Sequence, residues 1–306
     1  MIINIMKFLI YGSQGWIGNK VITYLSSQNI DFICGTSRVN DVFNLENEIL
    51  NSNCTHIISL IGRTHGTYEN VKIETIDYLE KPGKLVENVR DNLYSPILLA
   101  ILAQRYNLHF TYLGTGCIFD YDNNHPLEPP LHGFTEESKP NFFGSSYSIV
   151  KGFTDQLMTM YADHTLNVRI RMPITDEVNS RNFITKITRY SRICSIPNSM
   201  TILDELIPYM IDMSIKKITG TINLTNPGRI SHNEILMMYR DIVDPNFTWQ
   251  NFTIEEQDQI LASKRSNNYL ETERLQELYP DLMDIHQSVR ETLIRMRNKI
   301  YQNENA

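Results

Sequence analysis

The sequence predicts an α/β fold with a doubly wound parallel sheet that is covered by helices on both faces. Two observations lead to this fold class. Short β-rich runs alternate with helical stretches through the first half of the chain, the pattern that builds a parallel sheet. The first run leads directly into a glycine-rich turn, Gly12-Ser-Gln-Gly15-Trp-Ile-Gly18, which opens a helix. Such a turn between a first strand and a first helix is typical of a Rossmann-type domain.

The expected elements of the first half follow in order. The candidate strands are runs rich in β-branched and aromatic residues: Lys7–Tyr11, Asp31–Gly35, His56–Ile61, His109–Leu113 and Asn167–Met172. Three stretches between them carry apolar residues at helical spacing: Asn19–Gln28, Val89–Arg105 and Tyr147–Tyr161. Residues 1–10 are apolar but lack the features of a signal peptide, so we expect them to contain a buried first strand. Segment 120–146 is rich in proline and shows no periodicity, which predicts a long functional loop.

The alternation weakens after Pro173, and helical signals replace it. Ser231-x-x-Glu234 and Thr253-x-x-Glu256 predict capping boxes that open two helices, and residues 284–299 predict a terminal amphipathic helix. We therefore expect an NADP-binding Rossmann domain over residues 1–172 and a smaller, mainly helical substrate domain over residues 173–306. A helix followed by a short strand over residues 203–224 is expected to return to the first domain.

Composition and charge narrow the range of partners. The 306 residues include 28 Lys and Arg against 35 Asp and Glu, and the formal charge of −7 disfavours nucleic acid and anionic lipid. No apolar run approaches the roughly 18 residues of a spanning helix, so we expect neither a nucleic-acid nor a membrane partner. Four widely spaced cysteines predict no metal site and favour free thiols in a reducing, cytoplasmic compartment. The oligomeric state stays open, with a homodimer as one alternative.

The glycine-rich turn is the expected cofactor site, because its glycines allow the backbone to approach a pyrophosphate at a helix N-terminus. The expected contact residues in this turn are Gly12, Gln14, Gly15, Trp16, Ile17 and Gly18. NAD-specific sites hold a carboxylate at the end of the second strand, where this sequence has Gly35-Thr-Ser-Arg38 and no carboxylate. It therefore predicts NADPH, with Arg38 and Ser37 on the 2′-phosphate. The alternative is that Arg38 is only a solvated loop residue.

A Tyr-x-x-x-Lys pattern is the second chemical motif. On a helix it places both side chains on one face, so that the lysine lowers the pKa of the phenol and holds the cofactor ribose. The chain has two copies, and we favour Tyr147 with Lys151 over Tyr68 with Lys72. Tyr147 opens a helix after the strand that leads to Thr115, so the expected triad is Thr115, Tyr147 and Lys151. Thr115 would hold the substrate oxygen, and Tyr147 would donate a proton. The alternative is a strand threonine beside an amphipathic helix.

Longer motifs resemble a known family. Besides the glycine-rich turn they are Thr-Gly-Cys-Ile-Phe (115–119), Lys-Pro-Asn-Phe-Phe-Gly-Ser-Ser-Tyr-Ser (139–148), Arg-Asn-Phe-Ile-Thr-Lys (181–186), Ile-Pro-Asn-Ser-Met-Thr-Ile-Leu-Asp-Glu-Leu (196–206), Thr-Asn-Pro-Gly (225–228), Ser-His-Asn-Glu-Ile-Leu (231–236) and Arg-Ser-Asn-Asn (265–268). The sequence resembles the plant-type nucleotide-rhamnose synthases, which are extended short-chain dehydrogenases related to dTDP-4-dehydrorhamnose reductase. The resemblance implies a bifunctional 3,5-epimerase and NADPH-dependent 4-reductase that converts UDP-4-keto-6-deoxy-D-glucose to UDP-L-rhamnose.

The resemblance also implies roles for individual residues. Protons at C3 and C5 of this sugar lie beside the C4 ketone, so an acid/base group can exchange them through an enolate. Cys117 and Lys186 are the expected acid/base pair, and their structural alternatives are a buried core thiol and a surface lysine. Arg265 is the expected clamp for the diphosphate, because a guanidinium matches phosphate geometry. The expected contacts to the sugar or the uracil are Asn182, Asn198 and Asn226.

Other functions stay open at the level of sequence. A sugar-nucleotide 4,6-dehydratase generally carries Asp-Glu directly after its catalytic threonine, where this chain has Gly116-Cys117. The string Thr175-Asp-Glu-Val178 follows a later strand and does not serve Tyr147 in that way. A dTDP-4-dehydrorhamnose reductase-like enzyme without epimerase activity is a second alternative. A non-catalytic NADP-binding regulatory subunit is a third, although such a protein has less reason to retain the triad. The residues alone do not separate UDP from dTDP substrates.

Overall fold

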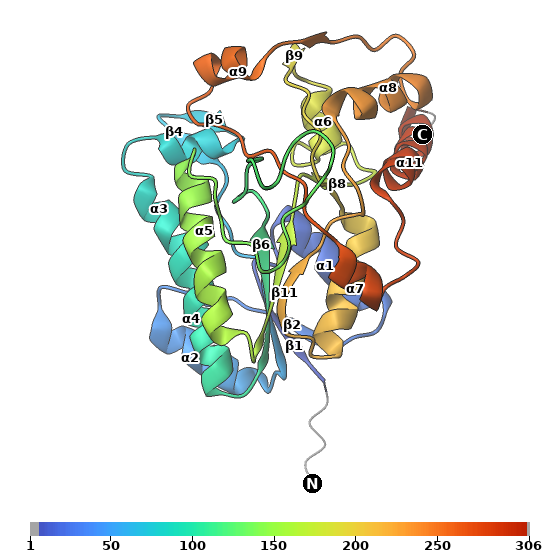
Figure 1. Cartoon of the computed structure of the whole chain (residues 1–306). Helices are drawn as coiled ribbons and strands as arrows, with labels where there is room; N and C mark the ends of the chain where they lie inside the picture. The colour runs from blue at the N-terminus through green and yellow to red at the C-terminus, as the bar shows by residue number, and fades with distance from the viewer. Residues whose placement is uncertain (1–5, 305–306) are drawn as a thin grey trace.

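A six-stranded parallel sheet forms the centre of the computed structural model, which describes residues 6–304 (Figure 1). Its strands are β1 (Phe8–Tyr11), β2 (Phe32–Cys34), β3 (His56–Ser59), β6 (His109–Thr115), β7 (Thr165–Ile170) and β11 (Gly220–Asn223). They are arranged in the order β11-β7-β6-β3-β1-β2, and every neighbouring pair is parallel. The prediction of a Rossmann-type parallel sheet is confirmed. Residues 1–5 of the expected first strand lie outside the described residues.

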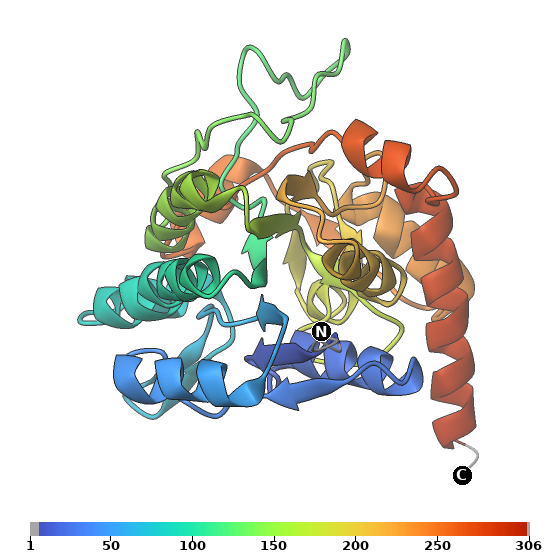
Figure 2. The same ribbon diagram turned by 90° about the horizontal axis from the view of Figure 1, so that it is seen from below.

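Helices cover both faces of the sheet because the central strands are apolar on both sides (Figure 2). In β1, Phe8 and Ile10 pack against α1 (Trp16–Ser27) and α7 (Leu203–Ile215), whereas Leu9 and Tyr11 face the opposite core. That second core is closed by α2 (Val42–Ser52), α4 (Ser95–Arg105) and α5 (Ser146–Met158). Because its side chains alternate between the two cores, β1 is buried on both faces, and the glycine-rich turn follows directly at its C-terminal end.

Some elements of this half were not expected from the pattern. The sequence predicts neither α2, whose apolar stripe consists of Leu45 and Ile49, nor the antiparallel hairpin of β4 (Gly66–Tyr68) and β5 (Val71–Ile73). The expected helix over residues 89–105 is longer, because α3 (Leu85–Val89) continues through a π-helical turn, η2 (Arg90–Tyr94), into α4. Two 3₁₀ turns complete this half, η1 (Ile76–Glu80) and η3 (Thr159–Tyr161). Residues 120–145 contain no helix and no strand longer than a single bridge, as expected, and α5 begins at Ser146.

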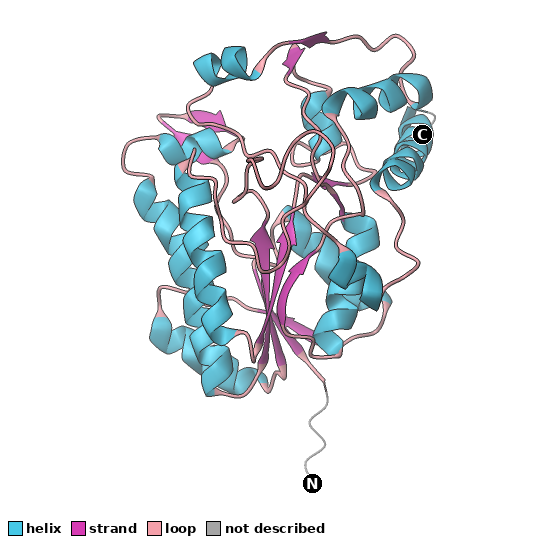
Figure 3. Ribbon diagram, in the orientation of Figure 1, coloured by secondary structure: helices cyan, strands magenta, loops and turns pink. Residues whose placement is uncertain are grey.

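A smaller lobe lies beyond the C-terminal ends of the strands, where the chain is mainly helical (Figures 1 and 3). Its helices are α6 (Phe183–Ile187), α8 (His232–Ile242), α9 (Ile254–Ile260) and α11 (Ile285–Glu304), whereas α10 (Glu273–Leu278) packs on β11 and its Leu275 belongs to the core of the main sheet. Two short parallel pairs connect them, β8 (Pro173–Ile174) with β10 (Thr201–Ile202), and β9 (Arg192–Ile193) with β12 (Gln250–Asn251). Both predicted capping boxes are present, at the starts of α8 and α9.

The two parts of the chain are interleaved. After β8, the chain returns to the main sheet as α7 and β11, which pairs with β7. The lobe has its own apolar core, formed by α6, α8 and α11 with Ile174 and Ile202. This arrangement places the lobe above the edge of the sheet where β1, β3 and β6 end. No helix within residues 6–304 is long and apolar enough to cross a bilayer.

Candidate active site

The turn after β1 has the geometry of a cradle for an anion. Gly12 adopts a φ of +82°, and a Cβ at that position would lie 2.8 Å from the carbonyl carbon of Leu60. A Cβ at Gly18 would lie 2.3 Å from the carbonyl oxygen of Gly12, so the turn and the helix meet without room for a side chain. Gly15 is the N-cap residue of α1 and is exposed, so the helix N-terminus is open to a ligand. These residues fit the pyrophosphate of a dinucleotide.

The other expected residues of this turn differ in what they offer. Gln14 is exposed beside Gly15. The side chains of Trp16 and Ile17 pack against the core between α1 and the sheet, so only their backbone faces the cradle. Because the α1 N-terminus carries free N–H groups, a backbone contact is sufficient for the expected role.

The corner after β2 holds a carboxylate, contrary to the expectation from the sequence. Glu48 of α2 accepts the backbone N–H of Ser37 at 3.1 Å, and the Ser37 hydroxyl donates to the Asn44 carbonyl at 3.3 Å. Both donors of Ser37 are therefore used within the protein, and its expected contact with the 2′-phosphate stays a prediction. Arg38 is exposed, and its guanidinium forms no hydrogen bond or ion pair within residues 6–304.

Thr115, Cys117 and Tyr147 come together where β6 ends. Thr115 is the last residue of β6, and its Oγ1 accepts the backbone N–H of Cys117 at 3.0 Å. Tyr147 lies in the first turn of α5 beside Thr115, and both side chains are 8% exposed. Burial and the neighbouring Cys117 raise the pKa of Tyr147, while Thr115 opposes this rise. The phenol is therefore a protonated donor at neutral pH.

Lys151 lies one helical turn after Tyr147 but has a different partner. Its Nζ donates a hydrogen bond of 2.8 Å to the hydroxyl of Tyr112, a buried residue of β6. Burial lowers the pKa of Lys151 to about 8, and Cys117 opposes this change. The expected lowering of the Tyr147 pKa by Lys151 is absent, because desolvation outweighs every other influence on that phenol. The sequence gives no signal for Tyr112, since a strand tyrosine resembles any other core residue.

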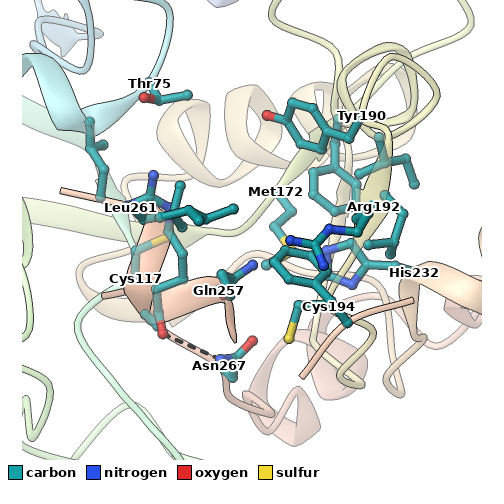
Figure 4. Close-up of a pocket in the computed structure, with 18 of the residues that line it drawn as sticks. Thr75, Cys117, Met172, Tyr190, Arg192, Cys194, His232, Gln257, Leu261 and Asn267 are labelled. Atoms are coloured by element: carbon teal, nitrogen blue, oxygen red, sulfur yellow. Dashed lines mark hydrogen bonds between the residues drawn. The ribbon is translucent and has the colours of Figure 1, made fainter. Parts of the chain in front are cut away.

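A cavity of about 620 Å³ opens above this floor (Figure 4). Cys117, Tyr147 and Ser148 line it at the edge of the sheet together with Thr75 and Ile76, and the lobe contributes most of the remaining walls. Figure 4 shows Thr75 and Cys117 on one side, facing Tyr190, Arg192 and His232 across the cavity. The lobe side is largely apolar and is lined by Met172, Phe183, Ile193, Cys194, Phe252 and Leu261. Arg189, Arg192 and Arg265 also line the cavity and no carboxylate within residues 6–304 does, so it suits an anionic organic ligand with a ring at one end.

Cationic side chains surround the mouth of the cavity. Arg265 lines it and pairs with Asp77 of η1 at 2.6 Å, which connects the lobe to the sheet domain. Lys186 of α6 is not among the described residues that line the cavity, and its ammonium has no partner within residues 6–304. Burial and then Arg181 lower the pKa of Lys186, while Glu74 opposes them. Lys186 and the nearby Arg181 form no ion pair within residues 6–304, and this pair of cations favours an anionic ligand near α6.

The structure contradicts the expected substrate contacts of Asn182, Asn198 and Asn226. All three are fully buried, and their amides are used within the protein. Asn182 caps α6, Asn198 accepts a hydrogen bond from the buried Arg171, and Asn226 accepts the backbone N–H of Ile202 at 2.9 Å. The amide nitrogen of Asn182 donates to the Thr175 and Glu177 carbonyls. That of Asn198 donates to the Ile196 carbonyl and to Asn267, and that of Asn226 donates to Glu205 and Ser288. These asparagines hold the fold and have no group left for a substrate.

The Arg-Ser-Asn-Asn motif has a second function besides carrying Arg265. Asn268 donates to the Gly116 carbonyl at 2.9 Å, and Ser266 donates to the Phe119 carbonyl at 2.6 Å. Buried Arg171 also donates to the Gly116 carbonyl, at 3.3 Å. The backbone on either side of Cys117 is therefore fixed from the lobe. Sequence reasoning missed this support because it joins segments that lie far apart in the chain.

Two patterns that the sequence analysis set aside do not form a second catalytic pair. Tyr68 and Lys72 lie on the two strands of the β4–β5 hairpin and not on one face of a helix, and Lys72 pairs with Glu74 at 2.7 Å. Asp176 and Glu177 of the Asp-Glu string form ion pairs with Lys299 and Lys20. The Asp-Glu string therefore does not serve Tyr147, whereas Tyr68 packs against the apolar cluster of Tyr78, Leu79 and Tyr147.

Comparisons with known proteins define first the class and then the family. No family model matches the sequence. The dTDP-4-dehydrorhamnose reductase of Bacillus anthracis, solved in complex with NADP, has a TM-score of 0.73 at 16% identity, covering 94% of this chain and 99% of that chain. The fold is thus that of the Rossmann-type sugar-nucleotide reductases.

Two more similar proteins decide the family. The UDP-rhamnose synthase of Acanthamoeba polyphaga mimivirus has a TM-score of 0.90 and 56% identity, covering 95% of this chain and 99% of that chain. The bifunctional dTDP-4-dehydrorhamnose 3,5-epimerase/dTDP-4-dehydrorhamnose reductase of Arabidopsis thaliana is 42% identical over 284 residues, 92% of this chain and 91% of the plant protein. The chain therefore belongs to the nucleotide-rhamnose epimerase/reductase family, and the resemblance found from the motifs is confirmed.

Proposed function

We propose that this protein is a bifunctional 3,5-epimerase and NADPH-dependent 4-reductase that converts UDP-4-keto-6-deoxy-D-glucose to UDP-L-rhamnose. The observation that carries the proposal is 56% identity over 95% of the chain to a UDP-rhamnose synthase. The plant relative is named for both an epimerase and a reductase, which supports two activities on one chain. Cys117 and Tyr147 line one cavity with Thr115 beside them, and together they supply groups for both steps.

The proposed cofactor contacts follow from the cradle after β1. The Gly12–Gly18 turn would hold the pyrophosphate, and Arg38 would bind the 2′-phosphate with its free guanidinium. Lys151 and Tyr147 would hold the nicotinamide ribose, as the Tyr-x-x-x-Lys arrangement on α5 allows. When bound, NADPH supplies the hydride that reduces C4.

For the epimerisation we assign the proton exchange to Cys117 and Lys186. A thiol and an amine both exchange protons near neutral pH, and the C4 ketone makes the protons at C3 and C5 acidic. The hydroxyls of Thr115 and Tyr147 would donate hydrogen bonds to the enolate oxygen. The ammonium of Lys186 has no hydrogen-bond or ion-pair partner within residues 6–304, and burial lowers its pKa. A larger fraction of Lys186 is therefore a neutral amine, able to accept a proton, than of a surface lysine at the same pH.

For the reduction, Tyr147 would protonate the oxygen at C4. Its raised pKa keeps the phenol protonated until charge develops on that oxygen, and Thr115 lies beside the phenol. Lys151, with a pKa of about 8, is still mostly an ammonium at pH 7, so it can hold a ribose hydroxyl.

For the nucleotide, we assign binding of the diphosphate to Arg265, which lines the cavity. Its guanidinium would bind the diphosphate in place of Asp77, with which it now forms an ion pair. The apolar wall around Phe183 and Phe252 suits the base.

All four cysteines are free, which supports a reducing compartment, and we propose the cytoplasm.

The test supplies UDP-4-keto-6-deoxy-D-glucose and NADPH, with the dTDP-linked sugar in parallel. We expect oxidation of NADPH and formation of UDP-L-rhamnose, identified by nuclear magnetic resonance. A protein that reduces only a sugar already epimerised at C3 and C5 would be the reductase alternative. A protein that binds NADPH but oxidises none of it with either substrate would be the regulatory alternative, and the proposal would be wrong.

A further inference from the structure

The turn after β2 contains a carboxylate that the proposed function does not use. Glu48 reaches this turn from α2 and receives hydrogen bonds from three residues. The backbone N–H and the hydroxyl of Thr36 donate to its Oε1 at 2.7 Å each, and Ser37 and Tyr11 donate to its Oε2 at 3.1 and 2.9 Å. An acidic residue that serves a dinucleotide site usually follows the glycine turn by about 20 residues, so the position of Glu48 gave no signal in the sequence.

Glu48 carries a negative charge that no cation neutralises. Partial burial raises its pKa, but the hydrogen bonds from Thr36, Tyr11 and Ser37 outweigh this effect and hold the pKa below its ordinary value. It forms no ion pair within residues 6–304. The donors from Thr36, Ser37 and Tyr11 fill most of the acceptor sites of the carboxylate. Glu48 therefore acts on a ligand at this corner through its charge and not as a direct partner.

The same hydrogen bonds remove the donors that a 2′-phosphate would need. In a sheet of this kind the adenosine ribose binds at the end of β2, beside residues 35–38. The N–H groups of Thr36 and Ser37 and the Thr36 hydroxyl point to Glu48, and the Ser37 hydroxyl points to the Asn44 carbonyl. Only the Arg38 guanidinium is left for the phosphate, and it lies on the same turn as the charge of Glu48.

We propose that Glu48 sets the cofactor preference of this protein by opposing the 2′-phosphate of NADPH, so that the preference over NADH stays small. The inference rests on the proposed function only in that the site binds a nicotinamide dinucleotide. Two unit charges of the same sign about 4 Å apart repel by about 1 kcal/mol in the dielectric of water, which corresponds to an effect of about threefold to tenfold on binding at this exposed corner.

The experiment measures the dissociation constants of NADPH and NADH separately, by calorimetry at low salt, for the wild type, Glu48→Gln and Glu46→Gln. Glutamine keeps the size of the side chain and an oxygen that accepts from Thr36, but its amide nitrogen replaces the oxygen to which Ser37 and Tyr11 donate. The dependence on salt therefore separates the loss of charge from this change in hydrogen bonding. We expect Glu48→Gln to bind NADPH about threefold to tenfold more tightly and NADH within about twofold of the wild type. Glu46 lies on the same helix and pairs with Arg105 at 2.6 Å, so Glu46→Gln is a control with the same change in charge.

Two further arms make each outcome decisive. Added salt is expected to reduce the gain of Glu48→Gln, because screening weakens the repulsion. Arg38→Ala is expected to abolish the preference for NADPH, since no other donor of the turn is free. Equal weakening of both cofactors in Glu48→Gln, or a ratio that neither Glu48→Gln nor Arg38→Ala changes, would overturn the inference. A wild-type protein that binds neither dinucleotide refutes the proposed cofactor as well, whereas binding of both with an insensitive ratio refutes this inference alone.

Discussion

Replacing both Tyr112 and Lys151 by apolar side chains is expected to stabilise the protein while abolishing its reductase activity. Lys151 is 5% exposed, and burial lowers its pKa from 10.5 to about 8. This difference corresponds to about 3 kcal/mol by which the folded protein disfavours the ammonium relative to the unfolded chain. The functional cation on α5 is thus a source of instability.

Because Lys151 is hydrogen-bonded to Tyr112, only the variant that replaces both residues is expected to gain stability. Lys151→Met alone leaves the Tyr112 hydroxyl buried without a partner, which costs about 1–3 kcal/mol and offsets the gain. Tyr112→Phe alone leaves the ammonium without its hydrogen bond and is expected to destabilise the protein. The double variant Tyr112→Phe/Lys151→Met removes both groups, and we expect its free energy of unfolding near pH 7 to exceed that of the wild type by about 2 kcal/mol.

The stability difference between the double variant and the wild type is expected to depend on pH. The pKa of this base is lower in the folded state, so the wild type loses stability as the pH falls from 10.5 to about 8 and bears the full cost below that. The gap between the double variant and the wild type is therefore largest at neutral pH and shrinks toward pH 10.5. Urea unfolding near neutral pH and at an alkaline pH measures it, with Lys139→Met as an exposed control. A double variant less stable than the wild type, or a gap independent of pH, would refute the reasoning.

Three further predictions concern the turn and the floor of the cavity. Gly18→Ala is expected to abolish cofactor binding in calorimetry, because its Cβ would lie 2.3 Å from the Gly12 carbonyl oxygen; unchanged affinity would contradict the cradle. Cys117→Ala is expected to stop deuterium uptake from solvent at C3 and C5 while cofactor binding persists, whereas Cys194→Ala, at another free thiol of the cavity, should leave uptake unchanged. Tyr147→Phe is expected to lower the rate of NADPH oxidation by about 10²-fold or more and the exchange rate by less; equal losses would indicate a structural tyrosine.

Much of the fold could be predicted because the main sheet repeats a strong local pattern. Each central strand is apolar on both faces, as Phe8 to Tyr11 illustrate, and such runs are visible in sequence. The glycine turn was equally visible, because Gly12 and Gly18 are required by the close approach of backbone to backbone. The lobe was harder, because its strands have two residues each, and α2 buries only three of its residues.

The candidate site divides in the same way. Thr115 and Tyr147 were predictable from the end of one strand and the start of one helix. Glu48 and Tyr112 were not, because their importance comes from contacts with residues that are distant in sequence. The substrate contacts predicted for the asparagines find no support in the structure, because a motif match identifies a position but not its role. Asn198, for example, is held by a hydrogen bond from the buried Arg171. Sequence motifs therefore locate the site better than they assign the roles within it.

The most direct measurement is the reaction in D₂O with UDP-4-keto-6-deoxy-D-glucose and unlabelled NADPH, followed by location of the deuterium in the product. The proposed function predicts UDP-L-rhamnose with deuterium at C3 and C5, introduced by the acid/base groups, and protium at C4, delivered as hydride. A product without deuterium at C3 and C5, or a sugar that is not reduced at C4, would contradict it.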